Sequence, residues 1–295
     1  MIRSSVKQYG AKTVWGAAIV VLMILLAVFA PLISPYGSEE LTGELLAGPG
    51  GEFPFGTDRR GMDVLSRTLH APRVDLTVGL AATLLAFFIG IPLGTVAGMF
   101  EDRGRLGGFS AQVIMRGMDI MQAFPVFVFA LALVAVLGAG PVNLILGLAF
   151  VNTPVFVRQI RTGILVLRDE PFVEAATIAG WSRLRIAFRH VLPNALGPAA
   201  SLVSVMIGFS ILLTAGLSFV GAGVRLPTAE WGVMISEGSN QLGTGEWWPS
   251  VFPGLSLAFT IFGFSLLGEG LREAPSRGGS GTLSRSHRWA ERMFG

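Results

Sequence analysis

Six long apolar segments alternate with polar ones along this chain of 295 residues. Each segment is close to the roughly 20 residues that an α-helix needs to cross a hydrocarbon core of about 30 Å. The pattern therefore predicts an all-α integral membrane protein with six transmembrane helices. These are expected at residues 14–33, 74–100, 113–137, 142–157, 195–220 and 250–271.

The polar stretches divide the chain into three parts. Residues 1–73 hold the first span and a long polar loop, 74–272 hold the other five spans, and 273–295 form a tail rich in Ser, Gly and Arg. The tail is expected to be disordered over 276–282. The first apolar run is interpreted as an uncleaved span, because it is long for a signal peptide and Pro31 follows the cleavage site that 28–30 would offer.

Composition narrows the chemistry that this chain can carry. It is 52% hydrophobic and 14% charged, well below the roughly 25% charged residues of soluble domains. It has no cysteine, which excludes disulfides and thiolate metal sites. Lysine occurs only at Lys7 and Lys12, so the Gly-Lys-Ser/Thr step of a phosphate-binding P-loop is absent. We expect no ATP binding through a P-loop of this chain.

The basic residues predict how the spans are oriented. Most Lys and Arg residues lie in 1–13, 101–116, 158–190 and 272–295, and few lie in 34–73 and 221–249. Because cytoplasmic flanks of spans are enriched in positive charge, both termini are predicted to be cytoplasmic and the 34–73 loop to face outward. The sequence pI of about 9.9 then reflects membrane orientation, and no nucleic-acid partner is expected.

Residues 169–198 form a long polar insertion between strongly apolar segments, and they predict two short helices. Asp169 is expected to cap the first, and Gly180 to end it in a left-handed conformation. Ser182 is expected to cap the second, which Pro193 would stop. The apolar face of the second helix would carry Leu184, Phe188 and Val191. Such a pair on a membrane surface, with small alanines exposed, would make a docking knob for a soluble partner.

This insertion resembles the EAA loop of permease subunits in bacterial ABC importers. The matching positions are Glu174, Ala175, Ala176, Gly180, Leu192 and Pro193. The general pattern has an aliphatic residue where this chain has His190. The variant FRHVLPN at 188–194 is similar to the C-type permease of the peptide-transport branch, as is PFGTDRRGMDVLSR at 54–67. Stretches 116–120 and 123–125 are also similar, so the resemblance covers about 53–272.

The resemblance implies a fold and a set of partners. The fold would be the MetI-like permease fold of ABC importers, with an added first span and with 74–272 as its core. A homologous second permease chain would complete a heterodimer around the solute pathway. Two cytoplasmic ATPase subunits would bind ATP and Mg, an extracytoplasmic binding protein would deliver the solute, and this chain would be non-catalytic. The location would be the bacterial cytoplasmic membrane.

The resemblance also implies which residues couple the chain to an ATPase. Glu174 would pair with a basic residue of that subunit, Ala175 and Ala176 would allow close approach, and Gly180 would set the turn. Closure of the ATPase pair on ATP would move this loop as a rigid body. The coupling residues implied are Phe172, Glu174, Ala175, Ala176, Gly180, Leu184, Arg185, His190 and Pro193.

Other residues are singled out by their spacing or their polarity. Gly90, Gly94 and Gly98 fall on one helix face and predict close packing against another span. Arg116 and Asp119 lie one turn apart and predict an ion pair. Polar residues within spans either line a solute pathway or bond neighbouring helices, and the sequence leaves both interpretations open. The candidates are Asn143, Asn152, Thr153, Ser204 and Ser210.

The predicted function is that of a permease subunit that translocates dipeptides, oligopeptides or similar small solutes. Nickel complexes, glutathione or another non-peptide solute remain alternatives, because the binding protein does much of the selecting. An ion-coupled secondary transporter is a more distant alternative, disfavoured by carboxylates that lie at span ends and by the lack of an internal repeat. A membrane-embedded enzyme is disfavoured as well. The sequence has no catalytic motif, and its three histidines lie far apart along the chain.

Overall fold

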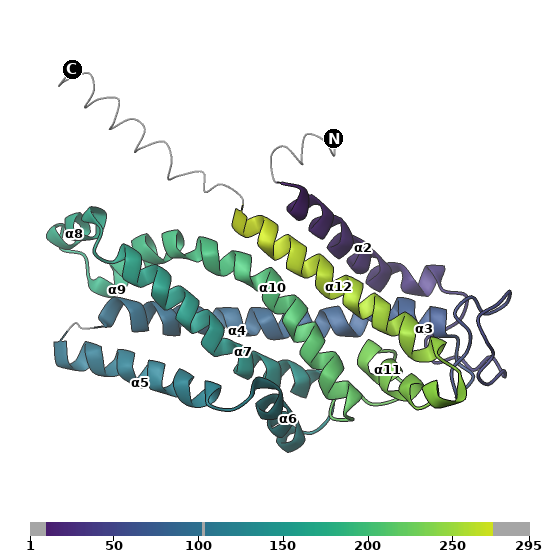
Figure 1. The fold of residues 1–295 in the computed structure, drawn as a ribbon. Helices are drawn as coiled ribbons and strands as arrows, with labels where there is room; N and C mark the ends of the chain where they lie inside the picture. Colours follow the sequence, from purple (N-terminus) through teal and green to yellow (C-terminus); the bar gives the residue numbers. More distant parts are fainter. Residues whose placement is uncertain (1–9, 102–103, 274–295) are drawn as a thin grey trace.

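The computed structural model describes residues 10–101 and 104–273, with the side chains of 104–107 excepted. In this part every regular element is a helix (Figure 1). They are α2 (Ala11–Ile33), α3 (Val64–His70), α4 (Pro72–Phe100), α5 (Gly104–Gln122), α6 (Val126–Leu137), α7 (Pro141–Leu167), α8 (Pro171–Ile178), α9 (Arg183–Ile186), the π-helix η1 (Ala187–Val191), α10 (Leu192–Phe219), α11 (Trp231–Ser239), the 3-10 helix η2 (Leu242–Thr244) and α12 (Trp248–Glu273). The predicted disordered segment, 276–282, lies outside the described residues.

Five helical segments of the described chain are long and apolar enough to span a membrane. They are Ala11–Ile33, Val64–Phe100, Pro141–Leu167, Arg183–Phe219 and Trp248–Glu273. The span predicted at 113–137 is not one straight helix, because α5 and α6 meet there at a bend of 91°. Pro125 explains the break, since a proline disfavours helical backbone at the residue before it. Counting the bent pair as one crossing gives the six spans that were predicted.

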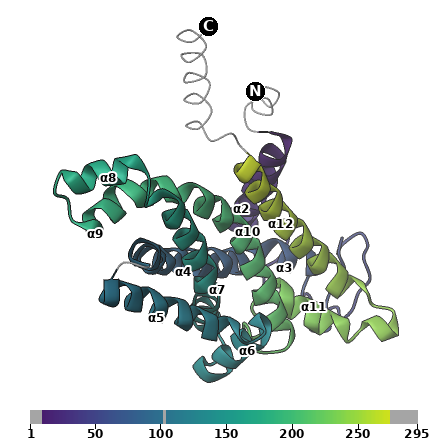
Figure 2. The ribbon, with the colours of Figure 1, turned by 60° about the vertical axis from the view of Figure 1, so that its left-hand side comes forward.

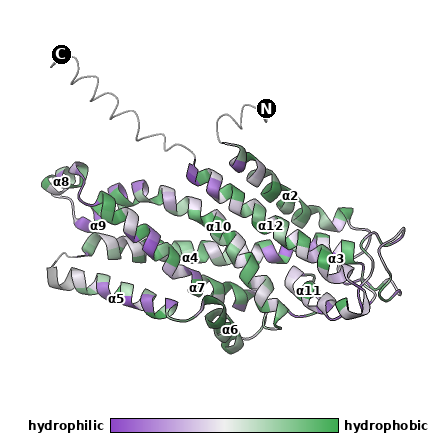
Figure 3. Cartoon of the chain, viewed as in Figure 1, coloured by the Kyte–Doolittle hydropathy of each residue, from purple (hydrophilic) through white to green (hydrophobic). Residues whose placement is uncertain are grey.

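The long helices lie side by side and place the connecting elements at two opposite ends (Figures 1 and 2). The α8 end carries α8, α9 and the last turns of α4 and α7; the α11 end carries α3, α11 and the loop at 34–63. Most of the apolar residues lie along the long helices, while polar residues are frequent on α5 and in the loops at the α11 end (Figure 3). This distribution is typical of a bundle whose middle is surrounded by lipid.

A glycine row joins α4 to α7. A Cβ atom built on Gly90 would lie 2.6 Å from Phe156 Cβ, and one on Gly98 would lie 2.8 Å from Ile164 Cβ. Neither distance leaves room for a side chain. The two helix backbones therefore approach closely, in the manner of small-xxx-small interfaces, where dispersion contacts hold helices together within lipid.

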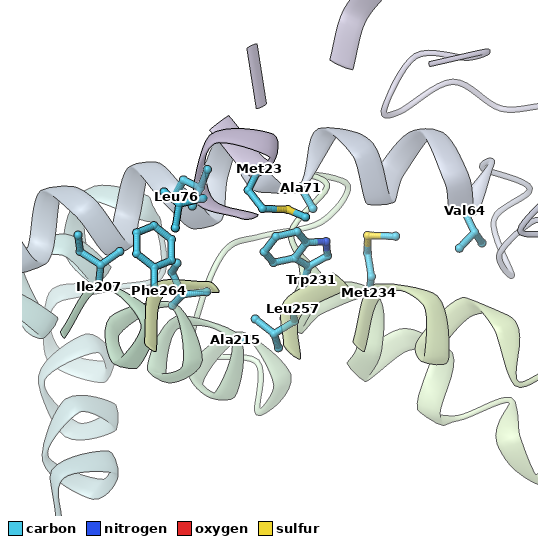
Figure 4. Close-up of a cluster of buried hydrophobic side chains, with 12 residues drawn as sticks. Met23, Val64, Ala71, Leu76, Ile207, Ala215, Trp231, Met234, Leu257 and Phe264 are labelled. Atoms are coloured by element: carbon cyan, nitrogen blue, oxygen red, sulfur yellow. The ribbon is translucent and has the colours of Figure 1, made fainter. Parts of the chain in front are cut away.

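The α11 end contains a helix where the sequence predicted only a loop, at 221–249. Helix α11 lies there, and its first residue, Trp231, is fully buried against Met23, Ala71 and Leu257 (Figure 4). The Glu230 carboxylate caps this helix by accepting hydrogen bonds from Gly232 N at 3.0 Å and Val233 N at 2.8 Å. A short helix of this kind is held by tertiary contacts more than by its own pattern.

The loop at 34–63 is fixed by hydrogen bonds and ion pairs rather than by helix. Asp58 Oδ1 accepts from Arg60 N at 2.8 Å and Met62 N at 3.0 Å, and Asp58 Oδ2 lies 3.7 Å from Arg67 Nε. Arg59 Nη2 reaches Glu237 Oε1 on α11 at 2.8 Å. The motif that resembled the peptide branch is thus a packed loop that leads into α3, with an Asp58–Arg67 pair inside it and arginines that contact Glu237 of α11.

Candidate functional site: the α8–α9 unit

Helix α8 begins at Pro171, one residue later than a cap at Asp169 would place its start. The N-cap is Glu170, with extended backbone at φ −73° and ψ 149°, and not Asp169. Pro171 supplies the reason, because it excludes the helical region for the residue before it and suits the first helical position itself. Glu174 then lies in the first turn, where its charge interacts favourably with the helix dipole.

Gly180 ends α8 in a left-handed conformation, with φ +81°. Trp181 N donates to Ala176 O at 3.2 Å and Gly180 N donates to Thr177 O at 3.0 Å, which together form a Schellman motif. No atom lies within 4 Å of a Cβ built on Gly180. Glycine is therefore favoured here by the backbone angle and not by lack of space.

The turn between α8 and α9 is built around Trp181. The Arg185 guanidinium lies 4.3 Å from the centre of the Trp181 ring, in a cation–π contact. The His190 ring lies 4.7 Å from the same indole at an angle of 52°. Ser182 caps α9 by accepting from Arg185 N at 3.4 Å. Arg185 and His190, two of the predicted coupling residues, thus both contact the Trp181 indole.

Pro193 does not stop the second helix, contrary to prediction. The chain passes from α9 through η1 into α10, and Pro193 lies in the first turn of α10. In η1, Leu192 N donates to Ala187 O, five residues back. This wider turn accommodates a proline that would otherwise clash with the carbonyl four residues earlier. Asn194 Nδ2 donates to His190 O at 2.6 Å, which links the first turn of α10 to η1.

One side of the α8–α9 unit (residues 171–191) is packed and the other is open. Val173, Ile186 and Val191 are buried in a cluster with Ile160 and Ile164 of α7. Large apolar residues are nevertheless exposed on the unit, and Ile178 is 81% exposed. The others of this kind are Phe172, Leu184 and Phe188. Exposed apolar groups gathered at one end of a bundle are typical of an interaction surface.

The open side carries acidic residues as well. Glu174 and Ala175 are exposed, whereas Ala176 is partly buried and packs inward against the cluster around Val173. An open hollow of about 290 Å³ beside α8 is lined by Arg168, Asp169, Glu170, Val173, Glu174 and Thr177. With three carboxylates and one guanidinium, the side chains that line this hollow carry a net negative charge. It suits a basic side chain of a partner.

Two models of known protein families match this chain. Residues 90–277 match the model of the binding-protein-dependent transport system inner membrane component. The chain belongs to this family. Residues 13–49 match a second model, the N-terminal TM domain of oligopeptide transport permease C, which accounts for the first span of this permease.

Curated relatives cover most of the permease. It is 38% identical over 260 residues to the dipeptide transport system permease protein DppC of Alkalihalophilus pseudofirmus, covering 88% of this chain and 83% of that one. It is 38% identical over 284 residues to a probable D,D-dipeptide transport system permease protein, DdpC, of Escherichia coli K12, covering 92% and 93%. It is 37% identical over 270 residues to a glutathione transport system permease protein, GsiD, of another Escherichia coli strain, covering 91% and 86%.

A solved structure supports the fold. The permease aligns with a chain of the MetNI methionine ABC transporter in an inward-facing conformation, with a TM-score of 0.56 and 16% identity, covering 72% of this chain and 96% of that one. At this identity the match concerns the fold alone. It agrees with the MetI-like fold expected from the sequence.

The polar residues proposed for a solute pathway are mostly engaged between helices in the permease. Asn152 Nδ2 donates to Ser210 Oγ at 2.9 Å, and Ser210 Oγ also lies 2.9 Å from Thr83 Oγ1, so that α4, α7 and α10 meet in one buried network. Ser204 Oγ donates to Phe264 O on α12 at 2.9 Å. These contacts match the helix-bonding interpretation that the sequence left open.

Two candidates of the same set lie elsewhere. Asn143 Nδ2 donates to Leu137 O at 2.7 Å and Gly138 O at 3.0 Å, and thereby fixes the turn between α6 and α7. Thr153 donates to Ala149 O at 2.8 Å and borders an apolar groove of about 470 Å³ formed by α4, α5, α6 and α7. A pathway role for these polar residues stays a prediction.

Asp119 has a closer partner than the one predicted from sequence. Arg116 Nη1 lies 3.9 Å from Asp119 Oδ2, while Arg158 Nη2 of α7 lies 2.7 Å from Asp119 Oδ1. The contact between Arg158 and Asp119 joins α7 to α5. No sequence motif could predict it, because the two residues are far apart in the sequence. Among the described residues, no group of three or more His, Asp or Glu side chains could hold a metal ion.

Sequence reasoning missed two further polar contacts. Asp75 and Glu230 are both buried, and Trp231 N, next to Glu230 in the chain, donates to Asp75 Oδ2 at 3.2 Å. Asp75 lies in the first turn of α4, at the start of the span that was predicted over 74–100. The other contact joins Arg168, which lies directly before the α8–α9 unit, to the end of α4.

Proposed function

We propose that this permease translocates peptides across the cytoplasmic membrane in an ATP-driven importer and that its α8–α9 unit docks into a cytoplasmic ATPase. The observation that carries the proposal is the exposed surface of residues 171–191 at one end of the bundle, with Glu174, Phe172 and Ile178 open to solvent. Family membership and the dipeptide permeases among the relatives support the peptide assignment.

The assembly follows from the family's dependence on a binding protein. A homologous second permease would complete the pathway, and two ATPase subunits would hold ATP and Mg between them. A solute-binding protein would dock at the α11 end, opposite the ATPases. Both termini of the chain would lie in the cytoplasm, in keeping with the distribution of basic residues. The chain itself would supply no catalytic group.

The coupling role assigns a task to each part of the α8–α9 unit. Glu174, together with Asp169 and Glu170 around the neighbouring hollow, would bind a basic side chain of the ATPase. Exposed Ala175 would permit close approach, while Ala176 would hold the packing inside the unit. The Schellman turn at Gly180 would fix the angle between α8 and α9, so that the surface moves as one body.

A second candidate solute is glutathione, because permeases named for glutathione transport match this chain at 37% identity over 91% of its length. Competition measurements decide between the two. Uptake of a labelled dipeptide by cells that carry the complete system should be reduced by excess unlabelled dipeptides. If labelled glutathione enters these cells and the labelled dipeptide does not, the glutathione assignment replaces the peptide one.

The docking role predicts the behaviour of Glu174→Lys and Gly180→Trp. Both chains should insert in the membrane at wild-type levels, because neither position is buried. Both should lose peptide uptake and fail to retain ATPase subunits during purification, the first by charge reversal and the second through strain at φ +81°. The measurement is uptake by cells together with co-purification of ATPase in mild detergent.

Glu44→Lys is the matched control, since Glu44 is an exposed glutamate of the 34–63 loop at the opposite end. It should leave the ATPase bound. Wild-type uptake and ATPase retention by Glu174→Lys and Gly180→Trp would remove the docking role from residues 171–191.

A further inference from the structure

The cytoplasmic-side end of α4 under the proposed orientation is held by another helix. The last four carbonyl groups of any α-helix lack partners within that helix. In the described chain α4 has no basic residue in its own last turn, where a cation would interact favourably with the helix dipole. Arg161 of α7 and Arg168, the residue after α7, take that place.

Arg168, directly after the last residue of α7, makes the first of these contacts. Its Nη1 atom donates to Gly98 O at 3.0 Å and to Glu101 O at 2.8 Å. Its Nε atom lies 3.4 Å from Asp169 Oδ2, and its side chain is only 14% exposed. The guanidinium is thus held in one orientation, with two carbonyl oxygens of α4 on one side and a carboxylate on the other.

Arg161 makes the second contact, two turns earlier on α7. Its Nε and Nη2 atoms donate to Glu101 Oε2 at 2.8 Å and Glu101 Oε1 at 2.5 Å. This bidentate pair fixes the side chain of the residue whose carbonyl oxygen Arg168 binds. The end of α4 is therefore held through both the backbone and the side chain of Glu101.

Arg168 lies close to the start of α8, so its contacts with the end of α4 also connect α4 to the α8–α9 unit. Pro171, the first residue of α8, follows three residues later, and Glu170 N donates to Leu167 O at 3.3 Å across the junction. The α8–α9 unit also packs on α7 through the apolar cluster of Val173, Ile164 and their neighbours. Apolar contacts allow sliding, whereas hydrogen bonds to fixed carbonyl groups are directional.

We propose that Arg168 is a positioning residue that joins the end of α4 to the start of α8, so that displacement of the α8–α9 unit by an ATPase moves α4 with it. This inference rests on the proposed coupling function. Arg168 does not touch the ATPase or the solute in this role. It transmits movement from the docking surface to a helix that packs along α7 and contacts α10 in the interior.

The test uses the complete importer in proteoliposomes, with Arg168→Met and Arg168→Lys. Methionine keeps much of the side-chain length but has no donor, whereas lysine can still donate to Gly98 O or Glu101 O. Arg168→Met should retain ATP hydrolysis and lose peptide uptake per ATP by about tenfold, and Arg168→Lys should recover a substantial part. Arg73→Gln, at an exposed arginine near the other end of α4, is the control and should match the wild type.

A spectroscopic readout separates transmission of movement from simple loss of stability. The chain has no cysteine, so spin labels on Phe88→Cys of α4 and Gly197→Cys of α10, the helix that continues from the α8–α9 unit through η1, would be the only ones on it. Both positions are exposed. In an otherwise wild-type chain that retains uptake, the label distance should be equal in nucleotide-free and ATP-trapped importers. With Arg168→Met it should differ between those states.

The outcomes separate this inference from the function on which it rests. If Arg168→Met transports as efficiently per ATP as the wild type, or if the label distance already changes in the otherwise wild-type chain, the transmission role is wrong while the coupling function stands. If the wild-type importer itself neither hydrolyses ATP nor retains an ATPase, the proposed function has failed and the role of Arg168 fails with it.

Discussion

At Gly94 the backbone of α4 lies so close to α7 that an added methyl group has no room. A Cβ atom there would lie 2.7 Å from Val157 O and 2.9 Å from Ile160 Cβ. The sequence could predict the interface, because glycines spaced four apart share one helix face. It could not name the partner helix, since the apolar residues that face the row on α7 resemble those of any other span.

Gly94→Ala should destabilise the permease by about 1–3 kcal/mol, because overpacking forces the two helices apart. The thermal unfolding temperature of the purified importer in detergent should fall by several degrees. Gly197→Ala is the control: Gly197 lies in α10, and no atom lies within 4 Å of its built Cβ. There the gain in helix propensity, about 1 kcal/mol, should keep or raise the unfolding temperature. Equal effects of the two substitutions would contradict the close approach of α4 and α7.

At the scale of single elements, α11 depends on a buried acid. Glu230 is fully buried at its start, and burial raises the pKa of the Glu230 carboxyl above its ordinary value. Hydrogen bonds from Gly232 N and Val233 N and contact with Asp75 act against that shift without cancelling it. A carboxyl whose folded-state pKa is raised contributes stability below its unfolded pKa of about 4.3, and that contribution is lost as the pH rises through the folded-state value.

The permease should therefore lose stability as the pH rises from about 5, and Glu230→Gln should flatten that dependence. Glutamine stays neutral and can still accept hydrogen bonds from the first turn of α11. The measurement is the thermal unfolding temperature of the purified importer across pH 5–9, with Glu44→Gln, at an exposed loop position, as the control. If Glu230→Gln keeps the wild-type slope, Glu230 is not the group that titrates.

The same scale shows where sequence reasoning reached its limit. Apolar runs predicted the long helices, and turn chemistry predicted the left-handed Gly180 and the Ser182 cap, because these are local properties. Helix α11 was missed because nine residues carry too short a pattern and its burial depends on distant chain. Pro193 was misinterpreted as a stop, since the π-turn that accommodates it follows from packing around Val191 rather than from a local rule.

At the scale of the whole molecule, the described chain has two ends with different chemistry. The α8 end presents an exposed, acidic and apolar surface, and the α11 end is closed by a loop tied to α11 through Arg59 and Glu237. The long helices connect them, with α4 and α7 joined along a glycine row and fixed together at Glu101. Six spans were predictable from hydropathy; the bend of 91° between α5 and α6 required the tertiary structure.

The central claim is that ATP hydrolysis by partner subunits, reached through the α8–α9 unit, drives peptide uptake by this permease. The most direct measurement is uptake of a labelled dipeptide into proteoliposomes that contain the importer and its binding protein, with ATP on the ATPase side and no ion gradient. We expect uptake that requires ATP and is lost in Glu174→Lys. Uptake by the permease alone, driven by a proton or sodium gradient and unaffected by ATP, would contradict the account and favour an ion-coupled transporter.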